Sequence, residues 1–183
     1  MRRTTPRTET LSCDGSPPQT PDLSKETAFE KQRGVSLVET RGGFCQVHVF
    51  DLSQPLMAQR LYVLRAVAES DISIDFMKLT PAGMSFLAPQ ELSKKLEATL
   101  EDIGVAHSIR NDRAIVMVHA VNIRDEEGLI AEIVQSAISA GAQIDHIGDG
   151  HDRLLLVVAA QHVERIASHF ERSLITQPKR KAS

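Results

Sequence analysis

The sequence has no tryptophan, one tyrosine, two cysteines and no long apolar run. A membrane helix needs about 20 consecutive apolar residues, so no membrane segment is predicted. Cys13 and Cys45 lie too far apart for the spacing of a metal site or a small disulfide framework, and so few cysteines are typical of a reducing compartment. We therefore expect a cytoplasmic protein.

A strong net charge is also missing. The 21 Lys and Arg residues against 24 Asp and Glu residues give a formal net charge of −3, which offers no electrostatic reason to expect nucleic acid or an anionic membrane as a partner. No nucleophile has a base at a suitable spacing, and Ser53 is expected to cap a helix. The sequence therefore predicts neither an enzyme nor a cofactor or metal site.

The two ends of the chain differ in composition from the rest. Residues 1–33 are rich in Thr, Ser, Pro, Arg and Glu and contain few large apolar side chains. Such a segment buries too little apolar surface to offset the entropy lost on ordering. We expect residues 1–33 and 176–183 to be disordered tails.

Between these ends the chain contains one pattern twice, 70 residues apart. Residues 70–77 read SDISIDFM, and residues 140–147 read AGAQIDHI. With the same shift and no gap, the alternating strand expected at 44–50 falls on 114–120, and two helices and two further strands keep their apolar phase. Agreement over five elements indicates a duplicated unit.

Each copy is predicted to run strand–helix–strand–strand–helix, and one more strand would complete a ferredoxin-like β-α-β-β-α-β unit. The first copy has that strand at 105–109, whereas the second ends in a helix. We expect Val35–Val38 to cross over and complete the second sheet. The predicted fold is α+β, with two ferredoxin-like units packed side by side: residues 44–110 form the first, and residues 34–40 with 111–175 form the second.

Three segments have the composition of turns. Arg41–Gly43 and Asn111–Asp112 are expected to be turns that end strands. The segment Asp145–Asp152 holds two histidines and three aspartates, a composition that could also indicate an adventitious or catalytic metal site. Because Asp-Gly is typical of a tight hairpin, whose side chains diverge, we interpret it as a turn.

This order of elements, with its spare leading strand, resembles the paired ACT domains in the C-terminal regulatory region of aspartate kinases. The resemblance rests on AVAESDISIDFM (residues 66–77), SAISAGAQIDHI (residues 136–147) and SFLAP (residues 85–89). It extends over roughly residues 34–174, and nothing in the chain resembles the kinase catalytic domain.

ACT domains typically bind small molecules, often amino acids, where two modules meet. The contacts come from the start of the first helix, where free N–H groups can hold a carboxylate, and from the second strand of the neighbour. In the first copy the corresponding helix-start positions are Pro55, Met57 and Ala58, without the acid or the glycine of the family. The resemblance implies a ligand site in the second copy, formed by Asp125, Glu127, Gly128, Leu129, Ile147 and Gly148, with Thr80 from the first copy.

The acidic helix start has two interpretations. Asp125, Glu126 and Glu127 would repel a ligand carboxylate and would favour a cationic group such as a lysine-like side chain. The same carboxylates suit the positive end of the helix dipole, in which case they stabilise the helix and bind nothing.

Together these features predict a non-catalytic regulatory protein that binds an amino acid or a related metabolite. Its expected partner is an enzyme of amino-acid biosynthesis, such as an aspartate-kinase-type subunit supplied in trans. A homodimer formed through the sheet edges is also expected, because an unpaired edge strand is a template for pairing. The alternative is an ACT module that binds no ligand and serves only in assembly.

Overall fold

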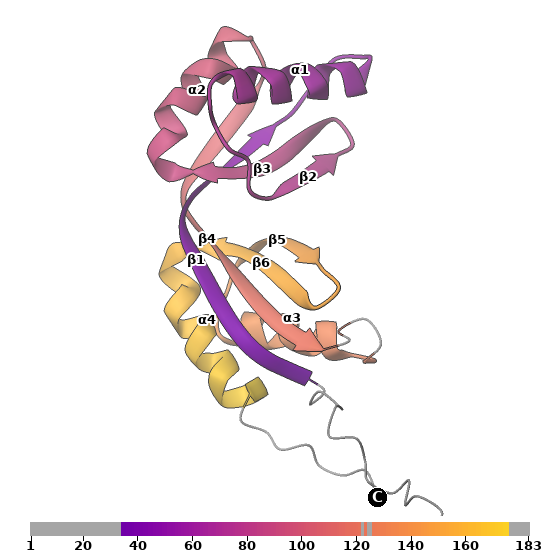
Figure 1. Ribbon diagram of the computed structural model, residues 1–183, viewed down its shortest axis with the longest axis vertical. Helices are drawn as coiled ribbons and strands as arrows, with labels where there is room; N and C mark the ends of the chain where they lie inside the picture. Colours follow the sequence, from indigo (N-terminus) through magenta and orange to yellow (C-terminus); the bar gives the residue numbers. More distant parts are fainter. Residues whose placement is uncertain (1–33, 122, 124–125, 176–183) are drawn as a thin grey trace, which may run out of the picture. The chain divides into compact units, whose positions relative to one another are not determined.

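The computed structural model describes residues 34–121, 123 and 126–175, so both predicted tails and Asp125 lie outside the described residues. Its centre is a six-stranded antiparallel sheet with strand order β2-β3-β1-β4-β6-β5 (Figure 1). The strands are β1 (Gly34–Val49), β2 (Met77–Thr80), β3 (Gly83–Pro89), β4 (His107–Val121), β5 (Ile144–Asp149) and β6 (Arg153–Ala159).

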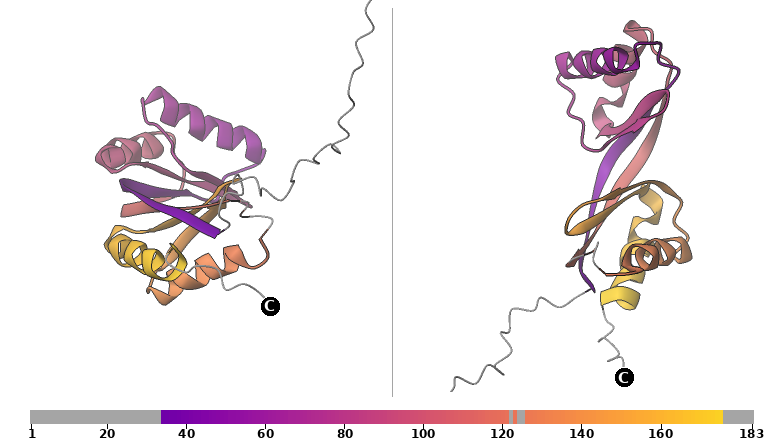
Figure 2. Two further views of the ribbon diagram at one scale, coloured as in Figure 1. Left: turned by 60° about the horizontal axis from the view of Figure 1, so that its bottom comes forward. Right: turned by 90° about the vertical axis from the view of Figure 1, so that its right-hand side faces the viewer.

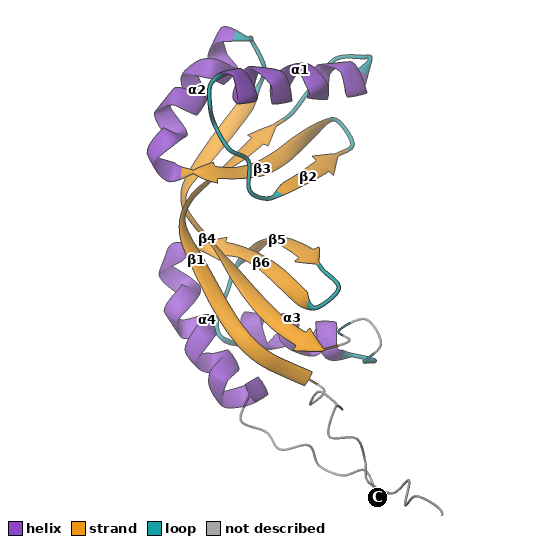
Figure 3. Ribbon diagram, viewed as in Figure 1, coloured by secondary structure: helices purple, strands orange, loops and turns teal. Residues whose placement is uncertain are grey.

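Four α-helices accompany the sheet in the described part of the chain. They are α1 (Leu56–Glu69), α2 (Ser93–Asp102), α3 (Leu129–Ser139) and α4 (Val163–Phe170). Short turns η1 (Gln90–Leu92) and η2 (Ala160–His162) precede α2 and α4, and a π-helical turn η3 (Glu171–Ile175) follows α4. Figure 3 shows α1 and α2 beside β2 and β3, and α3 and α4 beside β5 and β6; Figure 2 gives two further views.

The strands β1 and β4 are long because they pair with each other along both halves of the sheet. Residues 44–49 of β1 pair with β3 as well as with β4. Among the described strands, residues 34–41 pair with β4 alone, whose other neighbour is β6. Val35 lies opposite Ala120, and Val38 lies opposite Val118. The leading segment is therefore part of the same sheet region as β5 and β6, as the crossover prediction requires.

The sheet has two halves, which share the long strands β1 and β4. The first half comprises β2, β3 and residues 44–49 and 107–110 of the long strands. The second half comprises β5, β6 and residues 34–41 and 113–121.

The two turns predicted at Arg41–Gly43 and Asn111–Asp112 are wrong. Both segments lie inside the long strands, at a place where the pairing of β1 with β4 shifts register between Arg41 and Gln46. Extra residues there form bulges, which bend and twist a strand without ending it. Gly43 (φ 81°) and Asp112 (φ 54°) have the left-handed backbone that Gly and Asp tolerate best. The turn-like composition therefore produces irregular strand pairing.

Alternation along the strands separates three apolar clusters. Beneath α1 and α2, the first half buries Cys45 with Val47 and Phe86. Beneath α3 and α4, the second half buries a separate set that includes Phe170. A smaller cluster joins the opposite, helix-free faces of the two halves and comprises Phe44, Leu87, Ile115 and Val157. Each fully buried large apolar side chain contributes about 1.5–3 kcal/mol to stability.

Candidate functional site

The predicted ligand site at a helix start lies where the chain enters α3. Gly128 is the N-cap residue and has a left-handed backbone (φ 81°), and among the described residues no atom lies within 4 Å of the position that a Cβ would take. Glu127 is exposed, whereas Leu129 is buried in the core of the second half. Glu127 and the open backbone at Gly128 are thus available to a ligand, while Leu129 anchors the helix.

The other predicted ligand residues lie on β2 and β5. Thr80 ends β2, and its carbonyl accepts a hydrogen bond from Arg60. Ile147 is 41% exposed, but Gly148 packs under an aromatic ring, since a Cβ there would lie 2.6 Å from Phe76 Cε2. Gly148 therefore has a packing role in this structure.

The corresponding helix start in the first half is different. The predicted cap Ser53 is wrong, because Pro55 occupies the N-cap of α1 without a side-chain hydrogen bond, and the first turn holds no acidic residue. Arg60, only 9% exposed, donates from Nε to the Gly83 carbonyl at 3.1 Å and also to the Thr80 carbonyl. The protein's own guanidinium thus fills the space between α1 and the β2–β3 turn.

Sequence reasoning missed a polar cluster between the helix-free faces, which we call the seam cluster: Gln46, His48, Ser85 and His146. His146 Nε2 lies 2.9 Å from Ser85 Oγ, and its ring centroid lies 5.7 Å from that of His48. Gln46 is fully buried, and within the described part of the chain its side-chain amide has no hydrogen-bond partner. The sequence signal for this cluster was the alternation of Gln46 and His48 with apolar residues along 44–50.

Both imidazoles of the seam cluster have lowered pKa values. Burial lowers the pKa of His146 below 6.5; nearby His48 and Lys78 lower it further, and Asp145 opposes them. Burial also lowers the pKa of His48, with Arg110 acting in the same direction. Both rings are therefore mainly neutral near pH 7.

The aspartates of the repeated Ile-Asp signature form comparable ion pairs. Asp75 lies 2.9 Å from Arg41, and Asp145 lies 2.9 Å from Arg113 Nε. Asp145 Oδ1 also lies 3.6 Å from Arg110 Nη1. In each copy the signature aspartate therefore ties its segment to an arginine of a long strand near the bulges.

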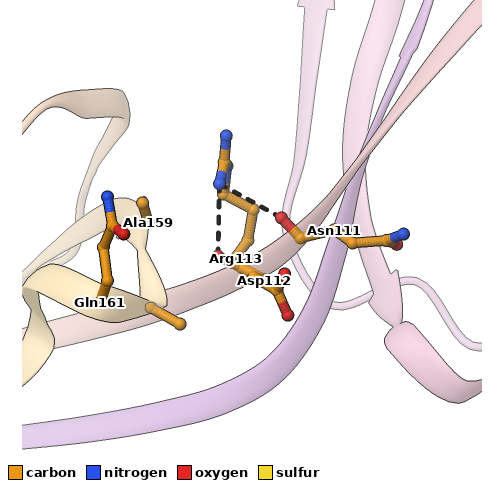
Figure 4. A pocket seen from close by; sticks show the side chains of 6 residues that line it. Asn111, Asp112, Arg113, Ala159 and Gln161 are labelled. Atoms are coloured by element: carbon orange, nitrogen blue, oxygen red, sulfur yellow. Dashed lines mark hydrogen bonds between the residues drawn. The ribbon is translucent and has the colours of Figure 1, made fainter.

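Two open depressions lie near these groups. The first, about 400 Å³, is lined by Asn111, Asp112, Arg113, Ala159, Ala160 and Gln161. Figure 4 shows Arg113 within it, donating to the carbonyls of Asn111 and Asp112 at 3.2 Å each. The second, about 440 Å³, lies between β2, β5 and α3 and is lined by Lys78, Val134, Ile138, Ile144, Asp145, His146 and Ile147.

The segment Asp145–Asp152 forms the β5–β6 hairpin, as predicted, with the Gly150 N–H donating to the Arg153 carbonyl at 2.8 Å. Across residues 34–121, 123 and 126–175, no three His, Cys, Asp or Glu side chains gather as a metal-binding group.

Among the helices that the structure describes, none is both long and apolar enough to cross a membrane.

The chain matches no protein-family model. It is 27% identical over 154 residues to an aspartokinase of Thermus thermophilus, a match that covers 78% of this chain and 38% of that protein. The chain thus spans about two fifths of the length of the curated relatives it matches.

Two solved structures match this chain over almost their whole length. The regulatory subunit of aspartate kinase from Thermus flavus superposes with a TM-score of 0.68 at 21% identity, covering 76% of this chain and 98% of that one. A structure of aspartokinase alpha and beta subunits gives a TM-score of 0.66 at 17% identity, covering 75% and 97%. The fold is that of the aspartate kinase regulatory region. The resemblance predicted from residues 66–77 and 136–147 is therefore confirmed.

Proposed function

We propose that this chain is a non-catalytic ACT-domain region that regulates an amino-acid biosynthetic enzyme of the aspartate kinase type. The observation that carries the proposal is a fold shared over 98% of the length of a regulatory subunit of aspartate kinase. In this proposal the sheet comprises two ferredoxin-like units, residues 44–110 and residues 34–40 with 111–175. The matching strand orders β2-β3-β1-β4 and β5-β6-β4-β1 support that division.

The proposed ligand is an amino acid or a related metabolite bound at the start of α3. Its contacts would be Asp125, Glu127, Gly128 and Leu129, with Ile147, Gly148 and Thr80 from second strands. The exposed carboxylate of Glu127 supports this placement, as does the backbone at Gly128, whose Cβ position has no atom of a described residue within 4 Å. The carboxylates would favour a ligand with a cationic side chain.

The proposed partners are a catalytic subunit supplied in trans and a second copy of the chain, in the cytoplasm. The solved complex of aspartokinase alpha and beta subunits supports an enzyme partner. The outer strand β2 leaves Met77 and Leu79 46% and 47% exposed, which supports pairing of copies through sheet edges.

The test uses an aspartate-kinase-type catalytic subunit and measures its rate with and without this chain across a panel of amino acids. The chain should make the rate respond to at least one amino acid, and Glu127→Gln should weaken that response. Glu97→Gln, on the exposed side of α2, serves as the matched control. If the catalytic rate is the same with and without this chain under conditions where the two proteins associate, the proposed regulation is excluded.

A second candidate is an assembly module without a ligand. It is favoured by Arg60, which fills the space beside the first helix start with internal hydrogen bonds. In that case no amino acid would raise the melting temperature, although ultracentrifugation would still detect the dimer.

A further inference from the structure

Arg60 is a charged side chain at a core position of α1. It shares the buried face of the helix with Val63 and Val67, and only 9% of it is exposed. The position 70 residues later in the duplicated pattern holds Ile130, which packs against the core of the second half. Burial of a charge costs free energy, whereas burial of an isoleucine is favourable. Packing of the core therefore does not explain the arginine.

The guanidinium of Arg60 is bound by acceptors from two elements. Nε donates to the Gly83 carbonyl at 3.1 Å, Nη2 donates to the Thr80 carbonyl, and Nη1 lies 3.3 Å from Met57 Sδ. Within the part of the chain that the structure describes, no carboxylate forms an ion pair with Arg60. Backbone carbonyls therefore accept hydrogen bonds from the guanidinium in place of a carboxylate partner.

These hydrogen bonds join α1 to the β2–β3 turn. Thr80 and Gly83 flank that turn and lie opposite each other in the register of the hairpin. The turn is also held by the segment between β1 and α1, because the Leu52 N–H donates to the Ala82 carbonyl at 3.0 Å. Arg60 thus connects the helix to a turn that is already bound to the chain leading into that helix.

The second half is built differently at the corresponding place. Ile130 has no side-chain donor, and the β5–β6 hairpin closes on its own backbone through the Gly150 N–H and the Arg153 carbonyl. The start of α3 presents the exposed carboxylate of Glu127, to which the proposed function assigns a ligand with a cationic group. The first half already contains a cation of that kind, as part of its own chain.

We propose that Arg60 is a built-in cationic ligand of the first half. Its guanidinium occupies a guanidinium-binding site formed by the Thr80 and Gly83 carbonyls, and it keeps α1 and the β2–β3 turn in one arrangement at every metabolite concentration. The first half is then a constant structural element, and the response to a metabolite comes from the second half. This division of roles rests on the proposed function, whereas the guanidinium site itself does not.

The test removes the side chain and supplies it again from solution. Arg60→Ala deletes the Cγ and Cδ methylenes and the guanidinium, which together correspond to ethylguanidinium. The full-length variant should melt about 5–10 °C below the wild type, and millimolar ethylguanidinium should recover most of that loss with saturation. Propylammonium carries a point charge without the planar fork and should recover less. The wild type and Arg65→Ala, an exposed change on the same helix, should respond to neither compound.

Two results would overturn the guanidinium site. One is a melting temperature of Arg60→Ala equal to that of the wild type, and the other is a response to ethylguanidinium that Arg65→Ala shares. If Arg60→Ala does not fold in buffer, it is refolded from urea with each compound and followed by circular dichroism. Greater recovery with ethylguanidinium than with propylammonium then supports the site, and any other result overturns it.

The kinase assay separates this site from the proposed regulation. If ethylguanidinium restores Arg60→Ala while the kinase rate never responds to the chain, the site stands and the proposed regulation falls. If an amino acid controls the rate through Glu127 and ethylguanidinium does not restore Arg60→Ala, the regulation stands and this site is wrong. If Glu127→Gln keeps the amino-acid response and restored Arg60→Ala loses it, the division of roles is wrong.

Discussion

Replacing Gln46 with methionine should stabilise the protein, although it removes a polar side chain from a strand that alternates between apolar and polar residues. Gln46 is 0% exposed, and neither polar atom of its amide has a hydrogen-bond partner in the part of the chain that the structure describes. Folding therefore removes this amide from water without replacing its hydrogen bonds. Methionine has a similar length and leaves no such group unsatisfied.

The magnitude follows from the two unsatisfied atoms. A buried donor or acceptor without a partner costs about 1–3 kcal/mol. The two atoms together cost about 2–6 kcal/mol. Because methionine is flexible and recovers only about half of this cost, we expect Gln46→Met to raise the free energy of unfolding by about 1–3 kcal/mol. At roughly 3 °C per kcal/mol for a chain of this size, the melting temperature should rise by about 3–9 °C.

A second glutamine provides the matched control. Gln90 donates from Nε2 to Asp112 Oδ1 at 3.0 Å, and its Oε1 accepts from the Asp112 N–H at 2.7 Å. Gln90→Met removes both bonds at the bulge, where Asp112 has its left-handed backbone. Partial exposure moderates the loss, so we expect a destabilisation of about 1 kcal/mol. The same substitution should thus have opposite signs at the two positions.

Urea denaturation followed by circular dichroism measures both variants, and equal slopes against urea would show that the unfolded states are comparable. Destabilisation by Gln46→Met as large as that by Gln90→Met would contradict this prediction. That result would mean that the Gln46 amide makes hydrogen bonds in solution, for example to buried water.

Two further predictions concern the seam cluster and a close backbone approach. Stability should fall as the pH drops below about 6.5, because the unfolded histidines take up protons at a higher pH than His48 and His146, whose pKa values folding lowers. The loss should be complete below the folded pKa values. Urea titrations at pH 8 to 5 should show a weaker pH dependence of the free energy of unfolding in a His48→Asn/His146→Asn double variant. An equal pH dependence in the variant and the wild type would contradict the role given to these two histidines. Gly83→Ala should cost about 1–3 kcal/mol, because its Cβ would lie 2.0 Å from the Val49 carbonyl oxygen. Gly42→Ala should be nearly neutral by the same measurement, because no atom of the residues that the structure describes lies within 4 Å of its Cβ position. Equal costs of the two substitutions would contradict this prediction.

Local periodicity predicted most of the elements because it reflects which side chains face a helix-covered core. The leading strand Val35–Val38 could be predicted to cross over because the second copy lacked one strand. The bulges could not be predicted, since Arg-Gly-Gly and Asn-Asp have the same local preferences in a turn and in a bulge. Whether such a segment forms a turn or a bulge depends on how it pairs with a strand that is distant in the sequence.

The candidate site was less predictable for the same reason. Ile147 was expected at a ligand site and does line the depression, but Lys78 belongs to the other copy and carries no local signal. Gln46 alternates along β1 with the core residues Cys45 and Val47, yet it is fully buried as well, and Phe44 on its own side packs with Ile115 and Val157 of the other half. Asp125 lies outside the described residues, so its expected role stays a prediction.

The pairing of residues 34–41 with the far part of β4 has a consequence for biosynthesis. This segment leaves the ribosome before the strand that will bind it has been translated, whereas residues 44–110 already contain every neighbour that their own sheet region requires. The nascent chain therefore carries an unpaired strand segment with open hydrogen-bonding groups throughout translation of the first half. Domain swapping with another nascent copy is the misassembly to which this order of synthesis exposes the protein.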